Sequence, residues 1–353
     1  MAARTRDRRS VMAVIDDLTT LWEPRIRDAF YVAISDIVDN VSLNQIADAI
    51  ETGDVERVFR MLGFNERSLQ PIIAEINNAY AASQMGVFRT FPIQAQNNIV
   101  RGVFRTDSRN VAAERWLSEH SSTLIVNLTN EARETTRQVL AAGMERGDNP
   151  RKTALDLVGR KAAGSSERVN GLIGLSPGQE RWVEGARQQL SRLDKSYFNR
   201  ELRDKRFDTL IAKAITNGRS LTGPEIERII GAYTSNVLRY RGESIGRTES
   251  MTALNAGAWQ SIQEAIDGEQ LTRDQVTRVW DATGDSRTRR THRLMEGQQR
   301  ALDEPFNTPG TLLRPGGYQL MFPGDSSLGA PAEETIMCRC RVKIVIDWLD
   351  NID

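Results

Sequence analysis

The sequence predicts an α+β protein in which a mostly helical N-terminal two thirds precedes a small C-terminal α+β module with a few strands. From residue 10 to about residue 266, apolar residues recur every three or four positions, which is the spacing of amphipathic helices. Beyond residue 270, two β-branched segments alternate instead, which indicates strands. Five prolines lie within residues 303–333, between these segments, and predict a long irregular stretch.

Two helix starts carry capping sequences. Ser176 precedes Pro177 and Gln179, and Thr222 precedes Pro224 and Glu225, so each start combines a capping hydroxyl with a reciprocal Gln or Glu. Helical spacing also covers Leu43 to Leu62, Ser68 to Met85, Ser121 to Gly147, Pro150 to Arg160 and Glu243 to Ile266. The two strands are expected at Val276 to Ala282 and Cys338 to Ile346.

We predict three consecutive regions. Residues 1–120 form a helical N-terminal region with a basic arm, residues 121–240 form a second helical region, and residues 241–353 form the α+β module. The arm, Met1 to Arg9, can contact nucleic acid or an acidic partner surface, and a solvated chain end is the structural alternative.

Composition excludes several classes of protein. The chain has 353 residues, with 47 Lys and Arg against 47 Asp and Glu, and it is 39% hydrophobic. These values are typical of a soluble globular protein and exclude a disordered polyelectrolyte. Charged residues interrupt every apolar stretch, so we expect no membrane span and no signal peptide.

The chain contains two cysteines, Cys338 and Cys340. A disulfide across one intervening residue would be strained, so we expect reduced thiols in a cytoplasmic environment. Together with His292 or His120 they have the chemistry of zinc ligands, but a single C-x-C lacks the second pair that makes a zinc motif specific. We therefore favour two buried thiols and predict neither a metal nor another cofactor.

The second strand segment has two chemically different faces. Alternation places Cys338, Cys340, Val342, Ile344 and Ile346 on one face and Arg339, Arg341 and Lys343 on the other. Three cations along a strand can follow a phosphate backbone or an acidic partner. The structural alternative, which we favour, is the solvated side of a sheet.

A polar cluster follows the first strand, with Ser286 expected to cap a short helix ending near Gly297. Its members are Asp281, Asp285, Arg287, Arg289, Arg290, His292 and Arg293. We favour a structural network in which Arg287 pairs with Glu249, and which leaves Arg289, Arg290 and Arg293 available to partners. The alternative is a catalytic group of Glu249, Asp285 and His292, although no motif of a known catalytic class accompanies it.

The C-terminal module carries an ordered series of short motifs. They are Arg247-Thr248-Glu249, Trp280-Asp281 with Asp285, Arg287 with His292, Leu294 and Gly297, Phe322-Pro323-Gly324-Asp325, and Cys338-Arg339-Cys340. Over about residues 240–347 this series resembles the phage Mu F-like minor head proteins, the phage head morphogenesis family. Relatives often carry Pro-Asn or His-Pro-Asn before C-R-C, where this chain has Glu334 to Met337, so we expect that loop to fold or bind differently.

The resemblance implies a minor head protein of a tailed phage. Such a protein associates with the portal in the procapsid and virion, in several copies around the portal, beside scaffold or major capsid protein. It can contact packaged double-stranded DNA and affect DNA retention or ejection. Its location is the virion, at the capsid interior or portal vertex, and the host cytoplasm during assembly.

The resemblance implies no enzymatic activity. It also implies that the α+β module of residues 241–353 is a Mu F-like module. The alternative function is a virion-associated hydrolase or transferase centred on Glu249, Asp285 and His292. Because the net charge is zero, we expect any DNA contact to be local and salt-dependent. The candidate residues for DNA or partner binding are Arg289, Arg290, Arg293, Arg339, Arg341 and Lys343. The candidate structural network is Arg247, Glu249, Trp280, Asp281, Asp285, Arg287, His292, Cys338 and Cys340.

Overall fold

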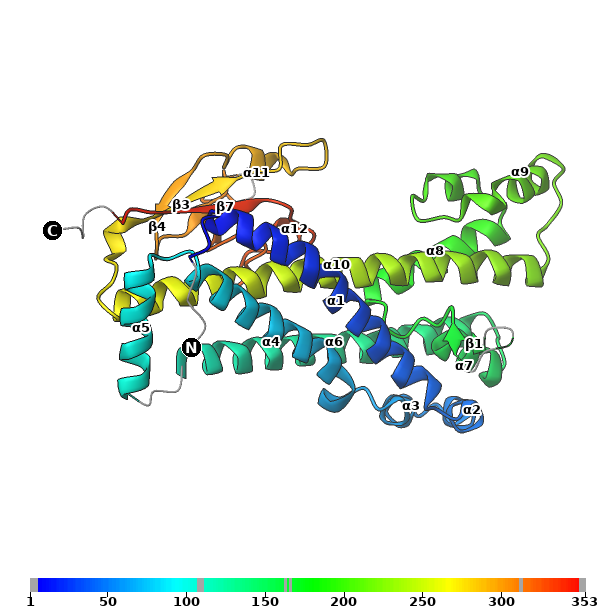
Figure 1. The fold of residues 1–353 in the computed structure, drawn as a ribbon. Helices are drawn as coiled ribbons and strands as arrows, with labels where there is room; N and C mark the ends of the chain where they lie inside the picture. The colour runs from blue at the N-terminus through cyan, green and yellow to red at the C-terminus, as the bar shows by residue number, and fades with distance from the viewer. Residues whose placement is uncertain (1–5, 107–110, 162–163, 165–166, 311–313, 349–353) are drawn as a thin grey trace. The chain divides into compact units, whose positions relative to one another are not determined.

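The computed structural model describes residues 6–106, 111–161, 164, 167–310 and 314–348. Helices dominate up to Asp267, and the longer strands follow it (Figure 1). The predicted α+β class, with a helical N-terminal two thirds and a small module containing strands, is therefore confirmed. None of the helices in the described ranges combines the length and apolar character that a membrane crossing requires.

The helices of eight or more residues all precede the three-stranded sheet. In chain order they are α1 (Val11–Asp39), α2 (Leu43–Glu51), α3 (Val55–Leu62), α4 (Glu66–Phe88), α5 (Ile93–Thr106), α6 (Val111–Glu145), α7 (Pro150–Val158), α8 (Pro177–Ser191), α9 (Asp208–Thr216) and α10 (Gly223–Asp267). The predicted capping box is present at α8, where Ser176 and Gln179 exchange hydrogen bonds. The same exchange joins Thr222 and Glu225 at the start of α10.

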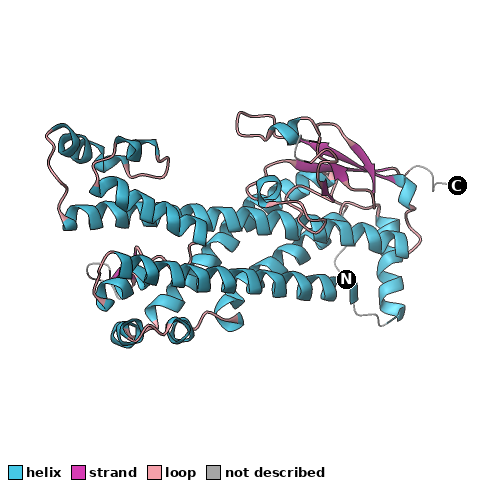
Figure 2. Ribbon diagram, turned by 180° about the vertical axis from the view of Figure 1, so that it is seen from behind, coloured by secondary structure: helices cyan, strands magenta, loops and turns pink. Residues whose placement is uncertain are grey.

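Three small antiparallel sheets are present among the described residues. Strands β1 (Arg160–Lys161) and β2 (Arg168–Val169) form one pair. The largest sheet has the order β4-β3-β7, from Gln299–Ala301, Val276–Asp281 and Arg341–Ile346. These strands lie side by side in Figure 2, where they are magenta.

The irregular stretch predicted for residues 303–333 is largely confirmed. It contains one short hairpin-like pair, β5 (Phe306–Asn307) and β6 (Gln319–Leu320), and leads into the single-turn helix α12 (Ala332–Thr335). The buried side chains of this stretch include the apolar Phe306 and Leu320 and the polar Thr308 and Asp325. Its backbone therefore surrounds a core without forming an extended ladder.

The chain divides into two compact units. Unit 1 comprises Met1–Asp28, Ile72–Glu119 and Ser244–Asp353, and unit 2 comprises Ala29–Pro71 and His120–Glu243. Unit 1 contains the three-stranded sheet and the whole motif series from Arg247 to Cys340. The division into residues 1–120, 121–240 and 241–353 stays a prediction.

Two helices expected from the sequence are one. The segments starting at Thr222 and near Glu243 belong to α10, which runs unbroken for 45 residues. The glycine between them, Gly242, lies inside the helix, and a Cβ at this position would overlap the ring of Tyr31 in α1. Its role is close packing within unit 2, and the sequence alone does not distinguish this role from a helix stop.

Within unit 1, α10 packs closely on α4. Gly257 lies so near the carbonyl oxygen of Tyr80 that a Cβ would overlap it. Two hydroxyls bridge the same helices: Ser83 donates to the carbonyl of Leu254 at 2.6 Å, and Ser261 donates to that of Gln84 at 3.0 Å. Small residues thus bring the two helix backbones together and satisfy carbonyl groups across the contact.

This contact predicts that Gly257→Ala destabilises the protein. The added methyl group meets backbone, which yields less readily than a side chain, and we expect the free energy of unfolding to fall by about 1–3 kcal/mol. Gly223→Ala in the same helix is the matched control, because its Cβ has open space. Urea unfolding followed by circular dichroism measures both variants, and equal stability of the two would contradict the packing argument.

Candidate functional site

The candidate site is built on the central strand of the largest sheet. β3 pairs with β4 on one side and β7 on the other, and the register sets Trp280 opposite Val342 and Asp281 opposite Arg341. Burial alternates along β3, with Val276, Arg278 and Trp280 inward. The side chains on one face of β3 therefore point into the core of the module.

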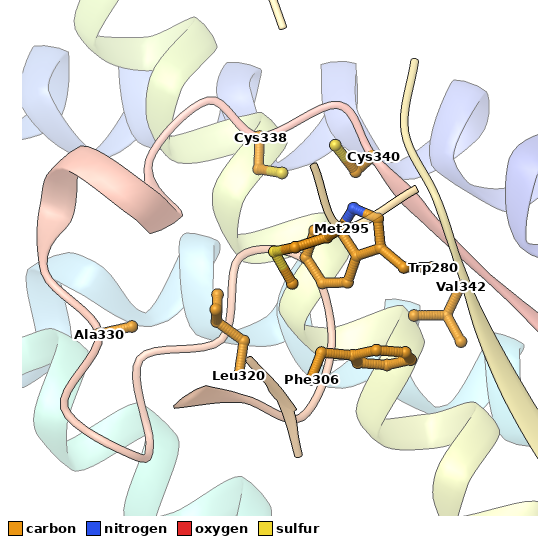
Figure 3. Close-up of a cluster of buried hydrophobic side chains, with 8 residues drawn as sticks. All are labelled: Trp280, Met295, Phe306, Leu320, Ala330, Cys338, Cys340 and Val342. Carbon is orange, nitrogen blue, oxygen red and sulfur yellow. The ribbon is translucent and has the colours of Figure 1, made fainter. Parts of the chain in front are cut away.

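Trp280 is the largest side chain of that core and is fully buried. Its ring makes edge contacts with His292, at a centroid distance of 5.2 Å, and with Phe306, at 5.3 Å. Figure 3 shows Cys338 and Cys340 side by side at one edge of the cluster, with Phe306 and Leu320 at the other. Burial of the two cysteines beside an aromatic ring confirms that the C-x-C faces inward.

A buried trio joins the two motif segments. His292 lies on α11 (Arg290–Arg293), and its Nδ1 is 3.4 Å from Sγ of Cys338 and 3.5 Å from Sγ of Cys340. On the other side of the ring, Nε2 lies 3.0 Å from Oε2 of Glu334. The trio thus contacts a carboxylate on α12, which also accepts a hydrogen bond from Thr291 at 2.9 Å.

The two thiols are electrostatically different. The hydrogen bond that Cys338 donates to Cys340, together with burial, raises the pKa of Cys338. The same bond, with His292 as a second partner, lowers the pKa of Cys340 to about 5. Cys340 is therefore the thiol that more readily becomes a thiolate.

Asp285 and Arg339 form a clamp across the ends of the two strands. The guanidinium of Arg339 donates to both carboxylate oxygens, at 2.5 and 2.6 Å. This bidentate pairing with Arg339 holds the pKa of Asp285 well below its ordinary value. The Asp285 carboxylate also accepts from the backbone N–H of Arg287 at 3.0 Å, so it organises the turn before α11.

Arg341 is held by two carboxylates. It pairs with Asp281 on β3 at 2.6 Å and with Asp16 on α1 at 2.9 Å. Arg247 on α10 reaches Glu23 on α1 at 2.7 Å. The side chains of Asp16, Arg247, Arg339 and Arg341 line a cavity of about 230 Å³ in unit 1. Each arginine around this cavity therefore already has an acidic partner.

The candidate binding cations differ in availability. Arg290, Arg293 and Lys343 are exposed. Arg289 donates to the carbonyl of Ile336, and Arg293 donates to that of Thr288 at 3.0 and 3.1 Å. The face of Arg339, Arg341 and Lys343 is consequently not a uniform cationic surface, because carboxylates neutralise two of its three members.

Two local predictions are wrong. The regular strand starts at Arg341, so Cys338 to Cys340 lie in the segment before it. Ser286 does not cap the short helix, whose N-cap is Arg289, because Asp285 takes the turn-forming role. Arg287 is exposed, and the arginine that pairs with Asp285 is Arg339; the pair of Arg287 and Glu249 stays a prediction.

Arg278 is a buried structural residue that the sequence pattern did not single out. It is 4% exposed and donates to the carbonyls of Ala301, Met321 and Glu304, while its guanidinium lies over the ring of Phe306. Burial lowers its pKa to about 10. The available signal was its position, since an arginine between Val276 and Trp280 on the inward face must find buried acceptors.

Arg278→Met is expected to lower the free energy of unfolding by about 1–3 kcal/mol, because it strands buried carbonyl groups in the irregular segment. The matched control is Arg290→Met, an exposed position where we expect a change of less than about 0.5 kcal/mol. Denaturant unfolding monitored by tryptophan fluorescence measures both. If Arg278→Met were as stable as the control, the carbonyl contacts would carry no weight in the module.

The comparisons with known proteins identify one family. Residues 205–343 match the family model described as Phage Mu protein F like protein, a stretch that begins upstream of the motif series and ends within β7. Searches of the curated proteins and of the solved structures found no match. The predicted resemblance is confirmed: residues 205–343 of this chain are a Phage Mu protein F-like region.

Proposed function

We propose that this chain is a minor head protein, active in head morphogenesis of a tailed phage. The match of residues 205–343 to the Phage Mu protein F-like family carries this proposal. In it, several copies associate with the portal in the procapsid and remain in the virion, at the capsid interior or portal vertex. Assembly takes place in the host cytoplasm, beside scaffold or major capsid protein.

The distribution of charge supports a role dominated by protein contacts. Arg339, Arg341 and Arg247 are each paired with a carboxylate of the same unit. Paired guanidinium groups release few counterions from DNA, so they contribute little to duplex affinity. Arg290 and Lys343 are exposed and supply the local DNA contact of this proposal, which acts on DNA retention or ejection.

In this proposal the chain is not an enzyme. His292 is 1% exposed and faces two thiols and Glu334, while Asp285 is engaged by Arg339. A general base needs access to a substrate proton, and an orienting carboxylate must contact that base. No specific observation therefore favours the hydrolase or transferase centred on Glu249, Asp285 and His292.

Cross-linking of purified virions tests the head assignment. We expect lysine- and carboxylate-reactive cross-links from this chain to the portal protein, and quantitative mass spectrometry should give a few copies per portal. The exposed Lys213 and Lys343 are useful reporters, because one lies in each unit. Absence of the chain from particles in which other head proteins are well detected would contradict the proposal.

The DNA contact is tested by reversing exposed charges. For the full chain carrying Arg290→Glu and Lys343→Glu, we expect weaker duplex binding and a salt dependence shallower by about one unit of log–log slope per lost contact. A double variant with Lys195→Glu and Lys213→Glu, at exposed sites of unit 2, changes the net charge by the same amount and is the control. Fluorescence anisotropy across a salt series measures all three proteins, and an unchanged slope in the Arg290→Glu and Lys343→Glu variant would remove these residues from the DNA interface.

A further inference from the structure

We propose that His292, Cys338 and Cys340 bind one zinc ion, which stabilises the Mu F-like region by joining the turn after β3 to the segment before β7. In the sequence, a lone C-x-C is a weak motif and favours free thiols. The structure adds the third ligand: among the described residues, these three form the group of His, Cys, Asp and Glu side chains suited to a metal. Their ligand atoms all lie within 4.8 Å of one another.

The distances agree with tetrahedral coordination. Zn–S bonds of about 2.3 Å and Zn–N bonds of about 2.0–2.1 Å place sulfur and nitrogen about 3.6 Å apart around one ion. The observed separations from Nδ1 of His292 are 3.4 Å to Cys338 and 3.5 Å to Cys340. One nitrogen equidistant from two sulfurs is the arrangement that a shared metal requires.

The opposite edge of the imidazole supports the same assignment. Histidine ligands of zinc usually present their second nitrogen to a carboxylate, which fixes the tautomer with the proton on that nitrogen. Here Nε2 of His292 faces Oε2 of Glu334 at 3.0 Å, and Thr291 holds this carboxylate by a hydrogen bond. Nε2 is buried and has no aligned hydrogen bond among the described residues, so a proton placed on Nε2 would have Oε2 of Glu334 within 3.0 Å as its acceptor after a small rotation.

Donor chemistry selects zinc among common metals. Two thiolates and an imidazole are borderline-soft ligands, which suit zinc and disfavour magnesium or calcium. Binding releases the protons of the free thiols, so affinity rises with pH until both sulfurs are ionised. The described residues supply three of the four ligands of a tetrahedral zinc ion, and in this proposal a water molecule takes the fourth position.

The location explains what the ion contributes. His292 is 46 residues from Cys338 and 48 from Cys340, and the stretch between them is mostly irregular. A cross-link that closes so long a loop removes conformational freedom from the unfolded chain. All three ligands are buried, which fits a structural ion that adds to a small core.

The first test uses the unmodified full chain. After purification without chelator we expect about one zinc per chain by plasma mass spectrometry, and X-ray absorption should show two sulfur ligands. Replacement by Co²⁺ should produce thiolate-to-cobalt charge-transfer absorption, and removal of zinc with a chelator should lower the thermal unfolding temperature. A chain that stays metal-free in excess Zn²⁺ or Co²⁺, or whose mass shows a Cys338–Cys340 disulfide, would overturn the proposal.

Variants then assign the ligands. Cys340→Ser should abolish stoichiometric zinc, whereas His120→Gln, at the other histidine, should retain it. Glu334→Gln should keep the protein folded and weaken zinc binding about 10–100-fold. Its matched control is Glu333→Gln, at the exposed neighbour. If Cys340→Ser fails to fold, the Glu334→Gln and Glu333→Gln variants and the Co²⁺ spectrum of the unmodified chain still test the site. Equal zinc affinity of these two variants, together with the absence of a charge-transfer band, would refute it.

Discussion

The antiparallel pairing of β3 with β7 is the constraint on which the C-terminal module depends. Its register places Trp280 opposite Val342 and Asp281 opposite Arg341. A slip of one residue would turn Trp280 and Arg278 away from the core and expose apolar groups. The segment that precedes β7 carries both cysteines. The same pairing brings this segment against α11, the short helix after β3 that carries His292.

Polar groups then define the loops around this pair of strands. The buried Arg278 donates hydrogen bonds to carbonyls of the irregular segment. The ion pair of Arg339 and Asp285 joins the segment before β7 to the turn after β3. Arg341 links the sheet to α1 through Asp16. A module with few ladder hydrogen bonds thus uses arginine side chains in place of regular backbone pairing.

These internal pairings limit what the module can offer to partners. Arginines that already hold carboxylates stabilise the fold, whereas Arg290, Arg293 and Lys343 are exposed and have no carboxylate partner among the ion pairs of the described residues. These ion pairs are consistent with the equal numbers of acidic and basic residues in the chain.

The sequence by itself determined the fold class, the two capped helix starts, the inward face of the C-x-C and the family resemblance, because these depend on local periodicity and on ordered motifs. Only the tertiary structure decided that α10 is continuous through Gly242, that Asp285 pairs with Arg339, and that Glu334 lies behind His292. It also made Arg278 an internal anchor. The physical reason is that a glycine's close neighbour and an ion's partner come from distant parts of the chain, and spacing along the sequence carries no information about which distant atoms will meet.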